Sequence, residues 1–358
     1  MGTHPERKSL SKLHTRRQFL TFSAGLGFML LTPGCKQSYL DQRQTSSSPP
    51  VPQGRSNHLA REDSHSETKR SDLLGIRNDS YKLMEWVPRI GARMVRIASD
   101  RDRFNTDPLV KKALEEASRL KLDILYAYNP QMLLPSRLIR QQIADFMRFV
   151  PVYAVGLSNE ADNPHIDFWQ NKDLRTLAVF TLLASDQISL ANPHTRVGIE
   201  AFVNPEHLNE FLEHLKSPDF TLFPDYIYLS REERVHLESI KFNPSRYFYA
   251  VHAYHSVDDV IWRMSVSERI LGKIGLPKAK VWLTEVGTSL EDKGVVPEMM
   301  NAFFRYKTLT PEIACIHELG RFEEYGYIDP YTEIPDPLNF PKIVQWSQRH
   351  HKIASFSW

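Results

Sequence analysis

The sequence predicts an α/β fold, a closed (β/α)8 barrel of the TIM type, and two observations support this prediction. Short apolar runs alternate with stretches whose apolar residues recur at helical spacing, and residues 72–358 hold eight such units. Alternating strands and helices indicate a parallel sheet. Eight units in a segment of this length favour a closed barrel over an open, doubly wound sheet.

The eight predicted strands are short and rich in apolar residues. They span residues 73–77, 93–99, 122–128, 152–158, 196–202, 247–254, 280–286 and 313–319. Amphipathic helices are predicted between them, most clearly over 108–121, 136–150 and 257–275. Gly275, followed by Pro277, is typical of a helix end. The connection over 203–246 is long for a simple loop, so an extra helix or strand is expected there.

The composition is that of a globular protein with a sizeable core. Of the 358 residues, 41% are hydrophobic and 25% are charged. The formal charge is +2, but residues 1–35 hold five Lys or Arg and one Glu, a net of +4, which leaves −2 for the remainder. A nucleic-acid-binding protein would show a basic stripe, so no nucleic-acid partner is expected. The two cysteines, Cys35 and Cys315, lie in different contexts, which argues against a disulfide framework and makes Cys315 a small core residue.

Residues 1–35 are predicted to be an export signal. A basic start precedes an apolar run from Phe19 to Leu31, which is shorter than the roughly 20 residues of a membrane span and fits a signal peptide. The segment TRRQFL, residues 15–20, resembles the twin-arginine signal, which implies the twin-arginine (Tat) export machinery as a partner. The segment LTPGC resembles a bacterial lipobox ending at Cys35, whose thiol would carry a lipid and attach the protein to a membrane. The expected location is periplasmic or in the cell envelope, and an uncleaved anchor is the alternative.

Residues 36–70 are predicted to be a disordered linker. The segment has almost no large apolar residues and no periodicity, so it cannot bury enough surface to offset the entropy lost on ordering. The folded domain is therefore expected to span residues 71–358.

Ionisable and amide side chains gather where the predicted strands end, which is the face that carries function in a barrel of this class. They are Arg96, Asn129, Asn159, Glu160, Glu200, His252, Tyr254, Glu285, His317 and Glu318. Glu160 and Glu285, on strands 4 and 7, are expected on opposite sides of the barrel mouth. Carboxylates are costly to bury without a partner, so this placement calls for a reason. Two carboxyl groups flanking a bond are what hydrolysis of a glycosidic bond requires, one to protonate the leaving oxygen and one to attack the sugar carbon.

The segments LSNEAD, VHAYH, WLTEVGTS and VRI resemble the clan A glycoside hydrolases, barrels in which strand 4 ends in Asn-Glu and strand 7 in a second Glu. The resemblance implies that residues 71–358 form a catalytic domain that hydrolyses O-glycosidic bonds of an oligo- or polysaccharide, by a retaining double displacement without a cofactor or a metal. Glu160 would be the acid/base and Glu285 the nucleophile.

The same resemblance implies roles for four neighbours. Asn159 would bind the sugar hydroxyl next to the reacting carbon, and Tyr254 would donate a hydrogen bond to the nucleophile. Arg96 would stabilise the ionised form of Glu285, and His252 would line the sugar subsite. Clan members usually carry a Trp near the end of strand 8 as a sugar platform, and here only Phe322, Tyr325 and Tyr327 are available.

Other interpretations stay open. Glu200 and Glu318 are interpreted as helix N-caps or surface ion pairs. His252 and His255 suggest a metal site, but a spacing of three on a strand places them on opposite faces. The alternative function is an exported barrel without catalysis that binds a glycan or an envelope partner, and such a protein would tolerate the loss of Glu160 or Glu285.

Overall fold

The computed structural model describes residues 73–77, 81–99, 108–128, 134–163, 174–288, 294–317, 327–328 and 335–351. All of them lie in one of two units of the chain, Asp63–Trp358. The predicted export signal with Cys35, the predicted linker, Asn129 and Glu318 lie outside the described residues. Within the described ranges, no helix is both long enough and apolar enough to cross a membrane.

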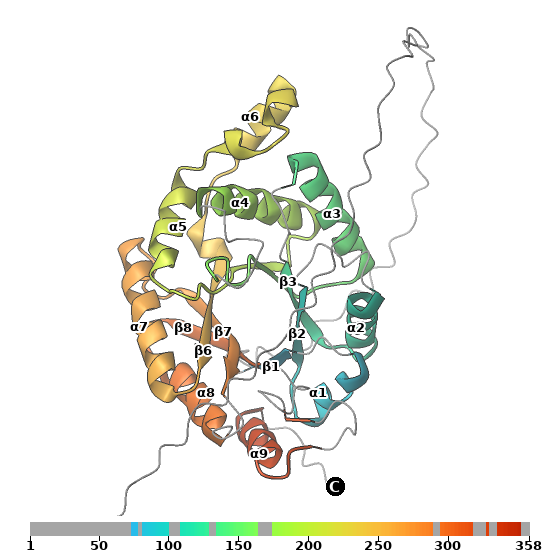
Figure 1. The fold of residues 1–358 in the computed structure, drawn as a ribbon, viewed down its shortest axis with the longest axis vertical. Coiled ribbons are helices and arrows are strands. Elements are labelled where there is room, and N and C mark those ends of the chain that lie inside the picture. The colour runs from blue at the N-terminus through green and yellow to red at the C-terminus, as the bar shows by residue number, and fades with distance from the viewer. Residues whose placement is uncertain are drawn as a thin grey trace, which may run out of the picture. The chain divides into compact units, whose positions relative to one another are not determined.

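Eight parallel strands form a closed barrel, which confirms the predicted fold class (Figure 1). Each strand pairs with the next in the chain, and β8 pairs with β1 to close the ring. The strands are β1 Leu73–Arg77, β2 Met94–Ser99, β3 Asp123–Tyr128, β4 Ala154–Leu157, β5 Arg196–Ile199, β6 Tyr247–Tyr254, β7 Lys280–Gly287 and β8 Thr310–Ile316. The last strand begins three residues before its predicted start. Its first residues, Thr-Pro-Glu, do not have an apolar strand pattern, yet Thr310 pairs with Lys280 of β7.

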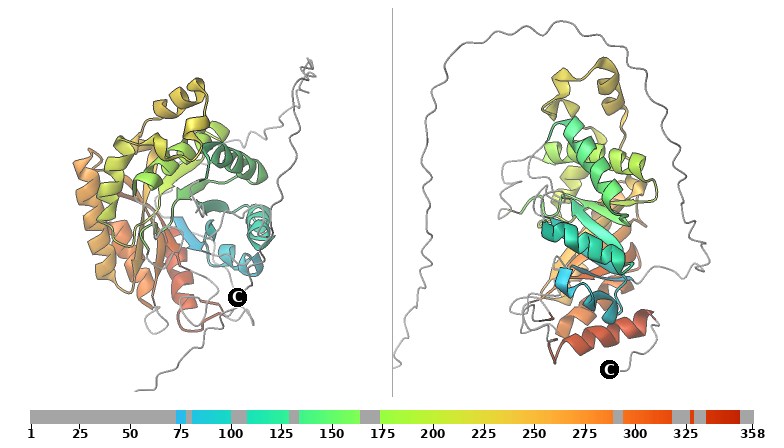
Figure 2. Two further views of the ribbon diagram at one scale, coloured as in Figure 1. Left: turned by 45° about the horizontal axis from the view of Figure 1, so that its top comes forward. Right: turned by 90° about the vertical axis from the view of Figure 1, so that its right-hand side faces the viewer.

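The helices lie outside the strands (Figures 1 and 2). They are α1 Trp86–Arg89, α2 Pro108–Arg119, α3 Ser136–Phe149, α4 Leu174–Ala191, α5 His207–Lys216, α6 Arg231–Ser239, α7 Val257–Lys273, α8 Val296–Arg305 and α9 Phe340–His351. The three helices predicted from periodicity are present as α2, α3 and α7. The turn after α7 uses Gly275, whose φ of 83° lies in the left-handed region. Its N–H and that of Leu276 donate to the last helical carbonyl groups, as expected of a glycine that ends a helix.

Alternate residues of the strands fill the barrel interior, which is the expected consequence of the two-residue repeat of a strand. Its lower layer is a cluster of buried side chains: Met94, Leu125, Ala154, Phe248, Trp282, Ile313 and Cys315. Phe248 stacks on Trp282 with ring centroids 3.7 Å apart, because the facing residue of β5 is Gly198, where a Cβ would lie 2.0 Å from the Phe248 ring. Cys315 is thus a core residue, as predicted. The layer fills the barrel on the side of the strands' amino ends, and the polar residues lie at the carboxyl ends, which form the mouth.

The long connection before β6 holds an additional helix, α6, as expected for the region 203–246. Asp225 accepts hydrogen bonds from the backbone N–H and the hydroxyl of Ser136 at the start of α3, and Glu233 of α6 pairs with Arg137. In Figure 1, α4 lies between the barrel strands and α6. This arrangement agrees with the burial of α4 on successive residues from Leu177 to Ser185, since a helix that is apolar all round needs cover on both sides.

Candidate active site

The structure brings six of the predicted residues into one cluster of hydrogen bonds and ion pairs at the carboxyl ends of the strands. They are Arg96, Asn159, Glu160, His252, Tyr254 and Glu285. The strands β2, β4, β6 and β7 supply them, or the turn that directly follows. Residues far apart in the sequence meet here because parallel strands in a barrel all end at the same face.

Glu285 is buried and is held by groups from three strands. Arg96 Nη1 of β2 lies 2.7 Å from one carboxylate oxygen, Oε1. The hydroxyl of Tyr254 donates to the other oxygen, Oε2, and the Nδ1 atom of His317 lies 2.8 Å from Oε2. The carboxylate therefore has a fixed orientation and charge-stabilising partners on both oxygens.

A β-bulge in β7 aims Glu285 into the barrel. Val251 pairs with Leu283 and His252 pairs with Glu285, so Thr284 is an extra residue relative to β6. Successive residues of a regular strand point to opposite faces, but here both Thr284 and Glu285 contact groups inside the barrel. Bulges redirect side chains in this way and are frequent beside active sites.

Glu160 lies in a turn after β4 in which the backbone is strained. Ser158 has a φ of 66° and Glu160 a φ of 45°, both in the left-handed region that non-glycine residues rarely adopt. The N–H of Glu160 donates to the carbonyl oxygen of Ala201, at 3.0 Å, which ties the turn to the end of β5. The Glu160 side chain is 17% exposed, whereas that of Glu285 is 2% exposed. Glu160 is thus the more solvent-accessible of the two carboxylates.

His252 and Asn163 hold the Glu160 carboxylate. His252 Nδ1 lies 2.9 Å from Oε1, and the Asn163 amide donates to Oε2 at 2.8 Å. Burial raises the pKa of the Glu160 carboxyl, but the hydrogen bond and the charge of His252 outweigh burial, so its pKa lies below the usual value. Glu160 is therefore ionised at neutral pH.

The Glu160 and Glu285 carboxylates face each other across a short gap. An oxygen of each, together with a ring nitrogen of His252, lie within 4.8 Å of one another. Among the described residues these three side chains form the one group that could hold a metal ion. A metal would need the neutral imidazole. Burial lowers the pKa of His252, but the charge of Glu285 and the adjacent Glu160 and Glu200 outweigh burial and raise it to about 9. Protonation of His252 thus competes with metal binding at neutral pH.

Arg96, which pairs with Glu285, also contacts two further groups. Its Nη2 atom donates to Asn159 Oδ1 at 2.8 Å and lies 3.5 Å from Glu200 Oε2. The first contact orients the Asn159 amide at the barrel mouth. The second contradicts the interpretation of Glu200 as an N-cap or surface ion pair, because its side chain is buried and points into the barrel. Glu200 directly follows β5, and its side chain points inward because the alternation of that strand, in which Gly198 faces the interior, continues through residue 200.

Two members of the site had no role in the sequence interpretation. His317 directly follows β8 and contacts Glu285, and its position at the end of a predicted strand was the one available signal. Asn163, three residues after Glu160, belongs to a turn whose geometry has no sequence pattern of its own. Tyr327 is buried, which does not support it as a sugar platform. His255 lies outside the group of Glu160, His252 and Glu285, which does not support a metal site with two histidines.

No family model and no curated protein matches the sequence. Solved structures do match. A monomeric β-xylosidase from Caulobacter crescentus CB15 has a TM-score of 0.56 at 14% identity, with 77% of this chain and 67% of that one covered. The GH39 enzyme from Xanthomonas axonopodis pv. citri has a TM-score of 0.53 at 14% identity, with 78% and 66% covered. The wild-type ZgEngAGH5_4 has a TM-score of 0.50 at 12% identity, with 78% and 96% covered.

These neighbours are glycoside hydrolases, and at such low identity the likeness concerns the fold. This chain spans about two thirds of the length of the first two. It has the (β/α)8 barrel that they share.

Proposed function

We propose that the protein is a retaining glycoside hydrolase that acts on an oligo- or polysaccharide. The observation that carries the proposal is the pair of carboxylates at the ends of β4 and β7, with an oxygen of each within 4.8 Å of the other. Retaining enzymes place their two carboxyl groups about 5–5.5 Å apart, whereas inverting enzymes leave about 6.5–9.5 Å for a water molecule. The short gap supports the retaining mechanism.

In the first step, Glu285 acts as the nucleophile. One of its oxygens forms a bond to the anomeric carbon while the bond from that carbon to the leaving oxygen breaks, and Glu160 gives the leaving oxygen a proton. Arg96, Tyr254 and His317 hold the attacking carboxylate in position. The Asn159 amide, whose oxygen accepts a hydrogen bond from Arg96, would bind the adjacent sugar hydroxyl.

In the second step, Glu160 acts as a base. It accepts a proton from a water molecule whose oxygen attacks the anomeric carbon, and the bond to Glu285 breaks. The product then has the same anomeric configuration as the substrate, because the carbon has been inverted twice.

The proton for the first step belongs to the pair of Glu160 and His252. His252 carries it at neutral pH, since the pKa of His252 is raised to about 9 and that of Glu160 is lowered. The two groups are in direct contact at 2.9 Å, so the proton can pass from Nδ1 to the carboxylate and from there to the leaving oxygen. Such a pair titrates as a unit.

A screen of the purified protein against aryl glycosides and bacterial or plant polysaccharides tests the proposal. We expect the protein to hydrolyse at least one glycoside with retention of the anomeric configuration, which NMR of the anomeric protons monitors. This activity should be lost in both Glu160→Gln and Glu285→Gln. Glu312→Gln is a matched control, because Glu312 pairs with Arg196 near the start of β5 and does not contact the site. Inversion would reassign Glu285 as a base. Glycan binding without turnover in any assay would favour the non-catalytic barrel.

We also propose that the protein is exported. The support is the resemblance of residues 1–35 to a twin-arginine signal and of LTPGC to a lipobox, which would attach the protein to a membrane through a lipid on Cys35. A carbohydrate polymer outside the cytoplasm is a substrate that an exported hydrolase could reach.

A further inference from the structure

Glu200 is a buried third carboxylate that the proposed reaction leaves without a role. Its side chain is inaccessible to solvent. Thr284 donates a hydrogen bond to Oε2 at 3.1 Å, and Arg96 Nη2 lies 3.5 Å from the same oxygen. Burial raises the pKa of Glu200, but the charge of Arg96 and the adjacent His252 outweigh burial and lower it below the usual value. Glu200 is therefore a buried negative charge.

The barrel makes room for this charge at a cost in packing. Gly156 of β4 lies against Glu200, and a Cβ at position 156 would be 1.9 Å from Glu200 Oε1. A larger side chain at 156 and the carboxylate at 200 cannot both occupy this space. An ionised group that is buried this deeply destabilises a protein unless its partners compensate, so a role beyond filling space is expected.

Glu200 completes a set of carboxylates around His252. The Nδ1 atom lies 2.9 Å from Glu160 and 3.9 Å from Glu285, and the opposite ring nitrogen, Nε2, lies 3.7 Å from Glu200 Oε2. Each nitrogen thus faces at least one negative charge, and this arrangement favours a proton on both. A neutral imidazole would present a lone pair to one of the carboxylates.

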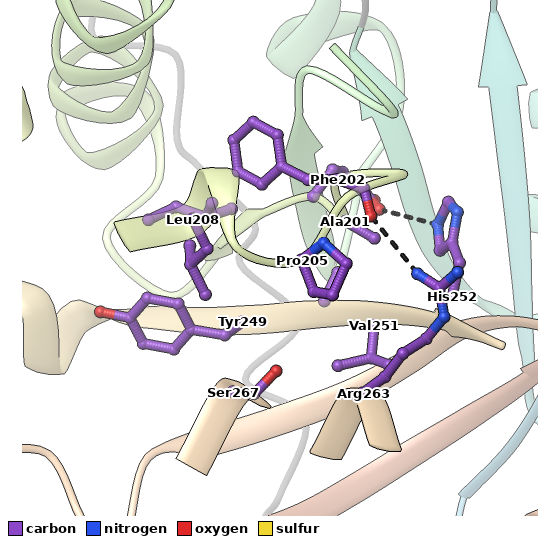
Figure 3. Close-up of a pocket in the computed structure, with 12 residues that line it drawn as sticks. Ala201, Phe202, Pro205, Leu208, Tyr249, Val251, His252, Arg263 and Ser267 are labelled. Atoms are coloured by element: carbon purple, nitrogen blue, oxygen red, sulfur yellow. Dashed lines mark hydrogen bonds and ion pairs between the residues drawn. The ribbon is translucent and has the colours of Figure 1, made fainter. Parts of the chain in front are cut away.

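The other charged groups near His252 have different partners, so Glu200 is the carboxylate that faces the Nε2 atom of His252. The small cavity beside His252 lies between β5, β6, α5 and α7, and Glu200 is the one acidic side chain among the residues that line it (Figure 3). Arg263 of α7 also lines the cavity, but its guanidinium pairs with Asp259. Arg96 pairs with Glu200 and Glu285, and His317 and Tyr254 contact Glu285.

We propose that Glu200 is a positioning residue that keeps His252 doubly protonated, so that a proton stands ready beside Glu160. The link to catalysis rests on the proposed glycoside hydrolysis; the link between Glu200 and His252 does not. In the first step the His252 Nδ1 proton passes to Glu160 and from Glu160 to the leaving oxygen, which leaves His252 neutral and Glu160 ionised. In the second step Glu160 takes a proton from water and returns it to His252. Glu200 keeps its charge throughout.

Nitrogen NMR of the full-length protein labelled with ¹⁵N-histidine tests the proposal without a substrate. The His252 signals are assigned by their loss in His252→Gln. In the wild type we expect both ring nitrogens to be protonated at pH 7.5. In Glu200→Gln we expect the pKa of His252 to fall by about 1–3 units, the effect of removing one close opposite charge. Glu200→Asp, which restores the charge, should recover most of the shift, and Glu312→Gln should leave the pKa unchanged.

Two results would overturn the proposal. One is a wild-type His252 with a single protonated nitrogen at pH 7.5, which needs no variant and so is independent of whether Glu200→Gln folds. The other is an unchanged pKa in a folded Glu200→Gln, which would mean that Glu200 only neutralises Arg96.

Kinetics separate this proposal from the proposed function. With an active glycoside, the basic limb of kcat/KM against pH should move to lower pH in Glu200→Gln by the shift that NMR measures. If the pKa shift is found but no glycoside is cleaved, the role of Glu200 stands and the hydrolase does not. If glycosides are cleaved and the basic limb does not move, Glu200 has no part in proton supply.

Discussion

Glu160 and Glu285 have the same side chain, and their different partners decide what each can do. Glu285 is held by Arg96, Tyr254 and His317, which stabilise its charge and fix its direction. Glu160 is more exposed and contacts a protonated histidine, so it can exchange a proton. This asymmetry is what a double displacement needs, since one carboxylate must stay ionised while the other alternates between two protonation states.

Glu160→Ala is expected to reduce the rate by about 10²–10⁴ with a leaving group that needs a proton, the usual share of general acid–base catalysis. An acidic phenol leaves without a proton, so the first step should survive with an aryl glycoside of that kind. Added azide should then replace water in the second step and yield a glycosyl azide, detected by mass spectrometry. Glu285→Ala should lose the first step with every leaving group. Equal losses in both variants with an activated substrate would contradict the division of roles.

His252 is expected to make stability depend on pH between about 6.5 and 9. Because its folded-state pKa is raised from 6.5 to about 9, its stabilising contribution is full below 6.5 and is lost as the pH rises through 9. Denaturant titrations at pH 6 and pH 9.5 give the free energy of unfolding of the wild type and of His252→Gln. The difference between the two proteins should be larger at pH 6 than at pH 9.5, by a few kcal/mol at most. A constant difference would mean that the pKa of His252 is not raised in the folded protein.

The sequence predicted most of the residues of the site, but not the buried carboxylate of Glu200 that also contributes to its charge. The six residues that meet at the barrel mouth were all predicted from their positions at strand ends. Glu200 was misinterpreted, because whether a residue just past a strand points inward depends on how the backbone continues. His317 could be found by position, yet its partner Glu285 is defined only once β7 and β8 are paired.

The elements position the site through two local departures from regular strands. The bulge at Thr284 lets both Thr284 and Glu285 enter the barrel, and the left-handed Ser158 and Glu160 turn the chain sharply after β4. Strand and helix positions follow from hydrophobic periodicity and were largely predicted. Bulges and strained turns were not, because they arise from pairing between strands and leave no period in the sequence.

Gly156→Ala is expected to destabilise the protein by about 1–3 kcal/mol or more, since its Cβ would overlap the Glu200 carboxylate in a closely packed barrel. Gly272→Ala is the matched control. It lies near the end of α7 with nothing within 4 Å of the added Cβ, so it should be neutral or stabilising by up to about 1 kcal/mol. Thermal unfolding measures both, and adding Glu200→Ala to Gly156→Ala should recover part of the loss. An unchanged melting temperature in Gly156→Ala would show that the two residues do not share this space.

The unit Asp63–Trp358 combines a barrel with an additional helix, α6. The segment that carries α6 contacts the start of α3 through Asp225 and Glu233. Its presence was predicted from the length of the connection, but its place was not, because single polar contacts such as that of Asp225 with Ser136 fix it.

Export is a separate property of the whole chain. If Arg16 and Arg17 form the receptor-read signal, changing both to Lys should leave the precursor in the cytoplasm, measured by fractionation and immunoblotting. Unaltered export of this variant would rule out the twin-arginine route. Cys35→Ala should release a soluble protein from the membrane fraction, and continued retention would argue against a lipid at Cys35.

The most direct test of the account is to trap the covalent intermediate. A 2-deoxy-2-fluoro glycoside with an activated leaving group, built on whichever sugar the screen identifies, slows the second step more than it prevents the first, so a glycosyl-enzyme should accumulate. Peptide mapping by mass spectrometry is predicted to find the sugar on Glu285, and no labelled peptide in Glu285→Gln. A label on any other residue, or an active enzyme that inverts and is never labelled, would contradict the assignment of Glu285 as the nucleophile.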